Sequence, residues 1–352
     1  MSGKVVDSKR HLICDALNRG LYSAIGGTVR VLLQEVIHMK RYILKRLLFA
    51  IPTLLGVFVV VFIVIRQIPG KPEEIMLGST ATQEQIDIFR EKHGLDKPVI
   101  VQFGIAVKNL LKGDLGDSLS HYRPVFEVVI KSLPGTIELA LYGIIISSVV
   151  SIALGVLAAR FRGRWPDVLV IAWSTIGASL PTFYIGLWVL VIFALQLGLI
   201  PVVGNMTAGV PHWKILFGPV LTMVLGGSLA RTTRSSMLEI MGEDYIRTAK
   251  AKGVSGAKIL FKHALGNALI PIVTMIGYGL AISFGGAIVL ETVFTRNGVG
   301  KLLIDAISSR DYPLVQGAAF IIAAFMIVAN LLTDVVTGLV DPRIRVTGDS
   351  TS

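Results

Sequence analysis

Six long apolar runs without a charged residue divide the chain. They lie at Leu47–Ile65, Leu139–Ala159, Val168–Ile200, Ile215–Ala230, Ala264–Leu290 and Pro313–Thr333. A helix needs about 20 apolar residues to cross a bilayer, and in lipid every backbone amide has to be paired inside the protein. The runs lack the period-two alternation of a membrane barrel. The pattern therefore predicts an all-α membrane protein with six transmembrane helices.

Two of the runs are irregular, and the fifth is rich in small residues. Val168–Ile200 is too long for one straight span and contains Pro181, while Ile215–Ala230 is short and glycine-rich. Small residues let membrane helices pack closely. In the fifth run they are Gly277, Gly279, Gly285 and Gly286.

The composition supports the membrane assignment. Hydrophobic residues make up 53% of the chain and charged residues only 16%, whereas soluble domains carry about 25% charged residues. The single cysteine, Cys14, excludes internal disulfides and cysteine-based metal clusters. The six histidines show no metal-ligand spacing, so no metal site is expected. The net charge of +11 is interpreted as a topology signal rather than as a nucleic-acid surface.

Basic residues gather on one side of the predicted spans. The loop after the second run holds Arg160, Arg162 and Arg164. The loop after the fourth run holds Arg231, Arg234, Arg247, Lys250, Lys252, Lys258 and Lys262, and the first run is preceded by Lys40, Arg41, Lys45 and Arg46. Because cytoplasmic loops are enriched in Lys and Arg, this bias places both termini in the cytoplasm.

The segment 67–135 is expected to form a small folded cap outside the cell. Gln83–Lys92 predicts a polar helix that ends before Gly94. An apolar stripe at helical spacing follows, formed by Val99, Phe103, Val107, Leu110 and Leu111. A solvated linker is the alternative.

The two ends of the chain are assigned by composition. Residues 1–38 form a cytoplasmic N-terminal extension without a span or a recognisable cleavable signal peptide. Met39, directly before Lys40 and Arg41, is a second candidate start, so the extension is either extraneous or a peripheral helix. The first transmembrane segment is expected at 39–66, the remaining five-helix core at 136–340 and a cytoplasmic tail at 341–352.

The cytoplasmic loop after the fourth run contains a short helix signal. Glu243 and Asp244 occupy a first turn, Lys250 and Lys252 a last turn, and Gly253 the position of a left-handed C-cap. Ser255 is placed to cap a following helix. The small residues Thr248, Ala249 and Ala251 permit close approach to another protein. A solvated basic loop that only fixes topology is the alternative.

Polar residues inside the runs are candidates for a pore lining. They are Ser174, Thr175, Ser179 and Thr182 around Pro181, and Thr274, Tyr278 and Ser283 in the fifth run. Ser and Thr also bond helix carbonyls, so both roles stay open. Glu138 and Glu291, at outer span ends, are interpreted as anchors. Asp334, near the inner end of the last span, is a functional candidate or a partner for a nearby arginine.

Several motifs in order give the chain a resemblance to a known family. They are Tyr42–Leu47, Ile68–Gly70, Gly113–Gly116, Ser179–Phe183, Ala230–Glu239, Glu243–Gly253, His263–Pro271, Glu291–Phe294, Arg310–Pro313 and Asp341–Arg345. Glu243–Pro271 resembles the EAA loop of ABC importer permeases. The chain from Met39 to Arg345 is similar to the peptide/nickel permease family, in particular the B-type subunit of dipeptide and oligopeptide importers. Lys71, Gly266 and Asn297 depart from the family pattern.

The resemblance implies a type I ABC importer permease with the MetI-like fold, in a bacterial inner membrane. The family combines two permeases, two ATPases and an extracytoplasmic solute-binding protein. The loop 241–271 is then the coupling segment. Its contact residues would be Glu243, Asp244, Tyr245, Arg247, Thr248, Ala249, Lys250, Ala251 and Gly253.

The resemblance also gives expectations about ATP and about the transported solute. Because the sequence has no P-loop motif, ATP and Mg²⁺ are expected on the partner ATPases, and the chain itself is expected to be a non-catalytic pore subunit without a cofactor. Besides protein partners it would contact only membrane lipid. Dipeptides or oligopeptides are the expected solutes, with glutathione, nickel chelates and opines as alternatives. An ion-gradient transporter and a membrane-anchored receptor are the rival functional classes.

Overall fold

The computed structural model describes residues 43–78, 81–204, 209–227 and 229–340. The chain divides into two compact units, Met1–Thr53 and Leu54–Ser352. The packing described below is that of the second unit. The expected N-terminal extension 1–38 and the tail 341–352 lie outside the described residues.

All regular elements among the described residues are helical. They are the helix Ile43–Gln67, α2 (Pro72–Leu77), α3 (Gln83–His93), α4 (Val99–Leu111), α5 (Val125–Arg160), α6 (Trp165–Ser179), α7 (Thr182–Val189), the π-helical η1 (Leu190–Gln196), α8 (His212–Leu225), α9 (Leu229–Met241), α10 (Asp244–Ala251), α11 (Gly256–Lys258), the π-helical η2 (Ile259–Leu265), α12 (Gly266–Val293), α13 (Val299–Ser308) and α14 (Tyr312–Val340).

Four of these helices are long and apolar enough to cross a membrane. They are Ile43–Gln67, Val125–Arg160, Gly256–Leu280 and Tyr312–Val335. Two bent helix pairs meet the same criteria together: α6 with α7–η1, bent by 110°, and α8 with α9, bent by 47°. When each bent pair counts as one span, the described residues contain the six spans that the apolar runs predict.

The sharp bend between α6 and α7 has its cause at Pro181. Proline has no backbone N–H and disfavours helical geometry in the residue before it. Leu180 is accordingly extended, with φ −93° and ψ 138°, and Pro181 becomes the N-cap of α7. The third run is therefore broken at the proline that made it irregular in the sequence.

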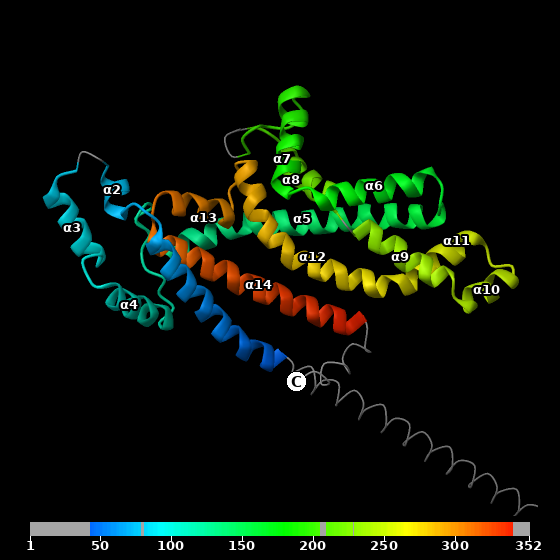
Figure 1. The fold of residues 1–352 in the computed structure, drawn as a ribbon, viewed down its shortest axis with the longest axis horizontal. Helices are drawn as coiled ribbons and strands as arrows, with labels where there is room; N and C mark the ends of the chain where they lie inside the picture. Colours follow the sequence, from blue (N-terminus) through cyan, green and yellow to red (C-terminus); the bar gives the residue numbers. More distant parts are fainter. Residues whose placement is uncertain (1–42, 79–80, 205–208, 228, 341–352) are drawn as a thin grey trace, which may run out of the picture. The chain divides into compact units, whose positions relative to one another are not determined.

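Helix α5 is the element around which the second unit packs. It contacts α6, α8, α9, α12, α13 and α14, and Figure 1 shows α9, α12 and α14 running beside it. One core cluster joins its first turns, at Val125 and Val129, to Val299 of α13 and Leu314 of α14. A second cluster joins Leu139 to the α7–α8 pair and to the end of α12. Apolar packing thus continues along the whole of α5.

Close helix contacts depend on glycine at specific positions. A Cβ on Gly277 of α12 would lie 2.1 Å from Cγ2 of Thr333 in α14, and the Thr333 hydroxyl donates to the Gly277 carbonyl at 3.1 Å. Gly279 is also close to a neighbour, whereas Gly285 and Gly286 have open space beside them. The small-residue packing expected for the fifth run is therefore present at its first two glycines only.

The helices between the first span and α5 partly follow the predicted pattern. Helix α3 begins with a capping box between Thr82 and Gln85 and ends at Gly94 in the left-handed conformation, as its sequence signals predict.

An ion pair joins α2 to α3. Glu73 of α2, almost fully buried, accepts a hydrogen bond of 2.7 Å from Nε of Arg90 in α3. This hydrogen bond raises the pKa of Arg90.

The apolar stripe of α4 is split in the structure. Phe103, Val107 and Leu110 are half-buried, but Val99 and Leu111 are exposed. No residue of α4 is fully buried. Three of the five stripe residues are therefore on the packed side of α4, and the two end residues are not; the folded cap stays a prediction.

Candidate functional site

The predicted coupling helix is present and has well-defined ends. Helix α10 spans Asp244–Ala251, with Glu243 as N-cap and Lys252 as C-cap. Gly253 follows with φ +75°. Its N–H donates to the Lys250 carbonyl at 3.0 Å, and the N–H of Val254 donates to the Ala249 carbonyl at 3.2 Å. These two bonds form a Schellman motif, so Gly253 ends the helix in the way that the sequence predicts.

One apolar side chain and one hydrogen bond hold α10 in place. Ile246 is fully buried, and α10 packs against η2. The hydroxyl of Tyr245 accepts a hydrogen bond of 2.8 Å from Nδ2 of Asn267, in the first turn of α12. The helix is thereby tied directly to the start of the fifth span.

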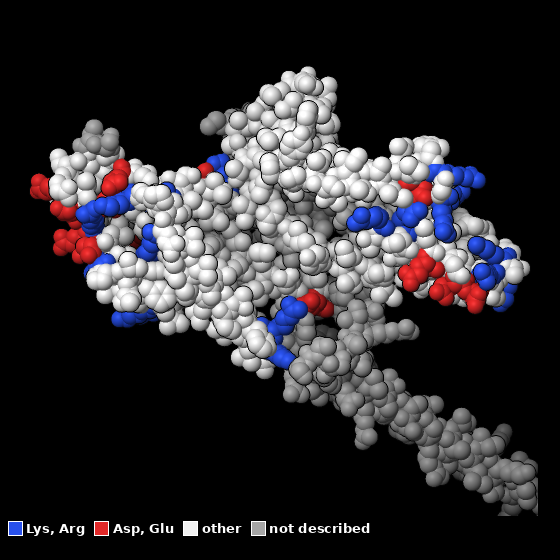
Figure 2. Space-filling model, viewed as in Figure 1, with Lys and Arg blue, Asp and Glu red and all other residues white. Residues whose placement is uncertain are grey.

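The rest of α10 is open to the surroundings. Figure 2 shows acidic and basic side chains gathered at the end of the molecule where α10 lies. Among the expected contact residues, only Ala249 is half-buried. The exposed ones are Glu243, Asp244, Tyr245, Arg247, Thr248, Lys250, Ala251 and Gly253. Ser255 is the N-cap of α11, although its side chain makes no capping hydrogen bond.

A buried ion pair joins α9 to α6 at the same end. The Asp167 side chain is 3% exposed and that of Arg234 is 22% exposed. Nη2 of Arg234 donates to Oδ2 of Asp167 at 2.8 Å, and Nε donates to Oδ1. The Gly163 N–H also donates to Oδ2 at 2.8 Å. Because Gly242 and Glu243 alone separate α9 from α10, the pair fixes the element that carries the candidate coupling helix.

At the opposite end of α12, Glu291 organises the connection to α13. Its carboxylate is fully buried and accepts from the Thr136 hydroxyl at 2.6 Å, the Gly300 N–H at 2.8 Å and the Lys301 N–H at 3.1 Å. A Cβ on Gly298 would lie 2.1 Å from the Glu291 carboxyl carbon. Glu291 therefore anchors the first turn of α13, which agrees with the anchoring role expected for it.

A second buried carboxylate begins α14. Asp311 is fully buried and accepts from the Ser118 hydroxyl at 2.6 Å, the Ser120 N–H at 2.9 Å and the Leu314 N–H at 3.1 Å. It thus connects the loop before α5 to the start of the last span. In the sequence, Asp311 is part of the motif Arg310–Pro313, whereas Ser118 and Ser120 belong to no recognised motif.

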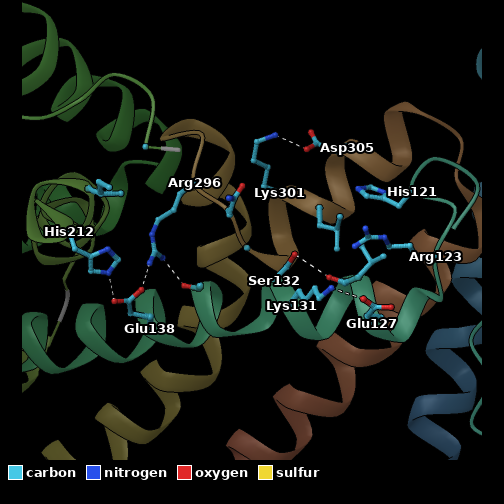
Figure 3. Close-up of a pocket in the computed structure, with 17 residues that line it drawn as sticks. His121, Arg123, Glu127, Lys131, Ser132, Glu138, His212, Arg296, Lys301 and Asp305 are labelled. Carbon is cyan, nitrogen blue, oxygen red and sulfur yellow. Dashed lines mark hydrogen bonds and ion pairs between the residues drawn. The ribbon is translucent and has the colours of Figure 1, made fainter. Parts of the chain in front are cut away.

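A polar cavity of about 1100 Å³ lies between α5, α13 and the start of α8 (Figure 3). Glu138 of α5 is at one side, where it bonds Arg296 and, at 2.5 Å, His212. Lys131–Glu127 and Lys301–Asp305 are ion pairs on its walls. Its charged lining comprises Arg123, Glu127, Lys131, Glu138, Arg296, Lys301 and Asp305. Groups of both signs therefore face one space.

The expected pore residues differ in burial and in the bonds that they make. Ser179, Pro181 and Thr182 lie exposed at the α6–α7 bend, Ser174 is fully buried, and Tyr278 is exposed on α12. The hydroxyls of Ser179, Thr274 and Ser283 bond carbonyls one turn earlier in their own helices. That is the alternative role for Ser and Thr in membrane helices, and pore lining stays a prediction.

Comparison with known proteins identifies the family. A model described as "Binding-protein-dependent transport system inner membrane component" matches residues 151–346, and the model of the corresponding N-terminal region matches residues 39–140. The chain belongs to this family.

Curated relatives match this permease over almost their full length. The glutathione transport system permease protein GsiC of Salmonella typhimurium is 39% identical over 87% of this chain and 99% of its own length. GsiC of Escherichia coli K12 is 37% identical over the same shares. Among solved structures, an inward-facing methionine ABC transporter, MetNI, matches 61% of this chain and 97% of its own with a TM-score of 0.48 and 17% identity.

Family membership confirms the main functional interpretation of the sequence. The chain is a helical inner-membrane permease subunit of an ABC importer of the peptide/nickel type. Transport by this family depends on a binding protein, so the rival assignments as an ion-gradient transporter or a receptor are set aside.

Sequence reasoning about the permease missed the side chains that position its loop. Asp167 directly precedes an apolar run and Arg234 is one of several basic residues in its loop, so neither residue identifies the other as its partner. Ile246 and Asn267 carried no distinctive pattern. The available signal was the pair of motifs Ala230–Glu239 and Glu243–Gly253, because two adjacent family motifs indicate elements that act together.

Removing one partner of the buried ion pair is expected to destabilise the permease. Asp167→Ala leaves the partly buried Arg234 guanidinium without its carboxylate, which costs about 1–3 kcal/mol. The variant should show a clear drop in thermal unfolding temperature in detergent, whereas Asp244→Ala, which breaks only an exposed pair, should not. Equal unfolding temperatures for the two variants would contradict a structural role for the Asp167–Arg234 pair.

Proposed function

We propose that the permease forms half of a translocation pathway for short peptides or peptide-like solutes, and that ATPase subunits drive it through α10. Its partners are a second permease, two ATPases and an extracytoplasmic binding protein. The chain itself performs no covalent chemistry and holds no cofactor, since ATP and Mg²⁺ belong to the ATPases. The observation that carries the coupling proposal is the short, polar, exposed helix α10, fixed from behind by a buried isoleucine.

The geometry of α10 suits force transmission. The helix is too short and too polar to lie in lipid, but Ile246 and the Tyr245–Asn267 bond attach it firmly to η2 and α12. Its exposed small residues, Thr248 and Ala251, leave space for another protein surface. A push on this surface is passed to α12 through Asn267 and to α9 through the two-residue connection. A solvated loop that only fixes topology would not require the burial of Ile246 or the Tyr245–Asn267 bond.

The proposed orientation follows the charges. Among the short loops, the α5–α6 turn holds three arginines and the α10–α11 segment four Lys or Arg residues, whereas the stretch after Pro201 holds only Lys214. The positive-inside rule places the more basic short loops in the cytoplasm, and the long segment 67–135 does not count in this rule. Both termini then lie in the cytoplasm, α10 faces the ATPases, and the polar cavity beside α13 faces the binding protein.

The solute proposal has two supports. Relatives of 37–39% identity are named glutathione transport permeases, and glutathione is a small peptide. The cavity beside α13 presents groups of both signs, which suits a solute with separate carboxylate and ammonium groups. The pore-lining roles of Ser174, Ser179, Pro181, Thr182, Thr274, Tyr278 and Ser283 are part of this proposal.

Disturbing the end of α10 should uncouple transport. Gly253→Val forces a β-branched residue to φ +75°, a strain of about 1–2 kcal/mol, and should shift α10 while the spans stay intact. We expect normal membrane insertion, but uptake reduced at least several-fold. Gly253→Asn should retain most uptake because Asn tolerates this conformation. Wild-type uptake by the Gly253→Val variant would contradict the coupling role.

Bulk on the exposed face of α10 should block the ATPase contact directly. Ala251→Glu adds a long charged side chain to an exposed position, and Ala257→Glu makes the same change on α11. The first variant should lose co-purifying ATPase or its solute-stimulated ATP hydrolysis, whereas the second should keep both. Ala251→Lys separates bulk from charge, because a cation is favourable at a helix C-terminus. Full ATPase stimulation in both Ala251 variants would place the contact elsewhere.

The solute class is tested with the assembled importer in proteoliposomes, including its own binding protein and ATPases. Reduced glutathione and alanyl-alanine should stimulate ATP hydrolysis and accumulate in the vesicles, because both present separate carboxylate and ammonium groups. Nickel–histidine chelate is the comparison probe. Stimulation by the chelate alone would overturn the peptide proposal and leave the permease assignment intact.

A further inference from the structure

Helix α4 has an apolar surface that the described part of the chain leaves uncovered. Ile100 is 83% exposed and Leu111 is 77% exposed. Val101 and Ile105 are exposed as well. At 100° per residue, these four side chains spread over about 140° of the helix circumference, and the half-buried Phe103 and Val107 lie on the adjoining arc, about 20–60° from Ile100. With 13 residues the helix is too short to cross a bilayer.

The inward side of α4 packs on the end of the first span. The rings of Phe103 and Phe62 are 5.0 Å apart in an edge-to-face arrangement. One turn further along the span, Nη2 of Arg66 donates to Oε1 of Gln102 at 3.1 Å. The first span ends at Gln67. Because a helix rises 1.5 Å per residue, Phe103 lies within about 8 Å of the end of the span along its axis.

That depth identifies what surrounds α4. The same turn of the span that contacts Phe103 also carries Val60, Ile63 and Val64, all exposed and apolar. Helix–helix interfaces in membranes are enriched in small residues, so these bulky side chains fit a surface that faces lipid. The exposed side of α4 continues this surface at the level where the hydrocarbon core meets the headgroups.

The charges of α4 fit the same surroundings. Lys97 precedes the helix, Lys108 lies in its last turn and Lys112 follows it, and all three are exposed. Lysine stems lie along apolar surface while the ammonium reaches water or phosphate. Hydrophobic stretches of 10–14 residues include interfacial segments, and cations beside an apolar helix face are attracted to anionic lipids. The helix has no Asp or Glu.

We propose that α4 is an interfacial helix, whose Ile100, Val101, Ile105 and Leu111 insert among lipid chains beside the end of the first span while its lysines contact anionic headgroups. The segment 67–135 is then not a cap standing wholly in water. Part of it rests on the bilayer and fixes where the first span ends. This inference does not depend on the solute or on the ATPase contact.

The test measures where α4 lies relative to lipid. Nitroxide labels are placed at Ile100→Cys and Leu111→Cys in a Cys14→Ser background, within the assembled importer in vesicles of phosphatidylethanolamine and phosphatidylglycerol. Collision with oxygen, which concentrates in lipid, is compared with collision with a water-soluble nickel chelate. Val60→Cys is the lipid reference, Glu84→Cys the water reference and Phe103→Cys the reference for a site facing protein.

The expected result is a preference for oxygen at Ile100 and Leu111, between the values at Val60 and Glu84. Access to the nickel chelate equal to that at Glu84 would mean that α4 stands in water, and would overturn the proposal. Low access to both reagents, as expected at Phe103, would mean that another protein covers α4, and would overturn it equally. Solute uptake by the labelled importers verifies that they are assembled, independently of the label environment.

Discussion

The first N–H groups of each helix have no acceptor inside that helix, and the need for acceptors at the points where packed helices begin is the constraint on which this structure depends. Buried carboxylates supply these acceptors. Glu291 accepts two N–H groups at the start of α13, and Asp311 accepts one at the start of α14. Asp167 accepts the Gly163 N–H before α6.

Each of these carboxylates also contacts a second element, which makes it a connection as well as a cap. Glu291 bonds Thr136 of α5, Asp311 bonds the serines of the loop before α5, and Asp167 bonds Arg234 of α9. The same carboxylate that accepts backbone N–H groups at the start of a helix therefore also fixes that helix to its neighbour. Helix α10, in contrast, ends at Gly253 through backbone bonds alone, as expected of an exposed segment.

Local features of this protein were predictable because their causes are local. The apolar runs, the break at Pro181, the ends of α3 and the Schellman end of α10 all depend on residues close in sequence. Family motifs then supplied the class of protein. Family membership confirmed that class, but it left the individual coupling and pore residues as predictions.

What the sequence could not provide depends on pairings between distant residues. Asp167 and Arg234 are 67 positions apart, and Thr136 and Glu291 are 155 apart, so neither member identifies the other. The half-buried state of Ala249 and the exposed ends of the α4 stripe likewise depend on what packs behind each helix. The bend of 110° at Pro181 is set by the same packing, because proline dictates a break but not its angle.

The length of α5 has a mechanical consequence. Its 36 residues extend over about 54 Å, well beyond the roughly 30 Å of the hydrocarbon core. One end carries Glu127 and Lys131 of the polar cavity, and the other reaches the turn held by Asp167. If α5 pivots as a rod about its midpoint, a tilt of about 5° moves each end by about 2 Å in opposite directions. A small rotation, rather than a change of fold, is then enough to widen one mouth of the pathway while narrowing the other.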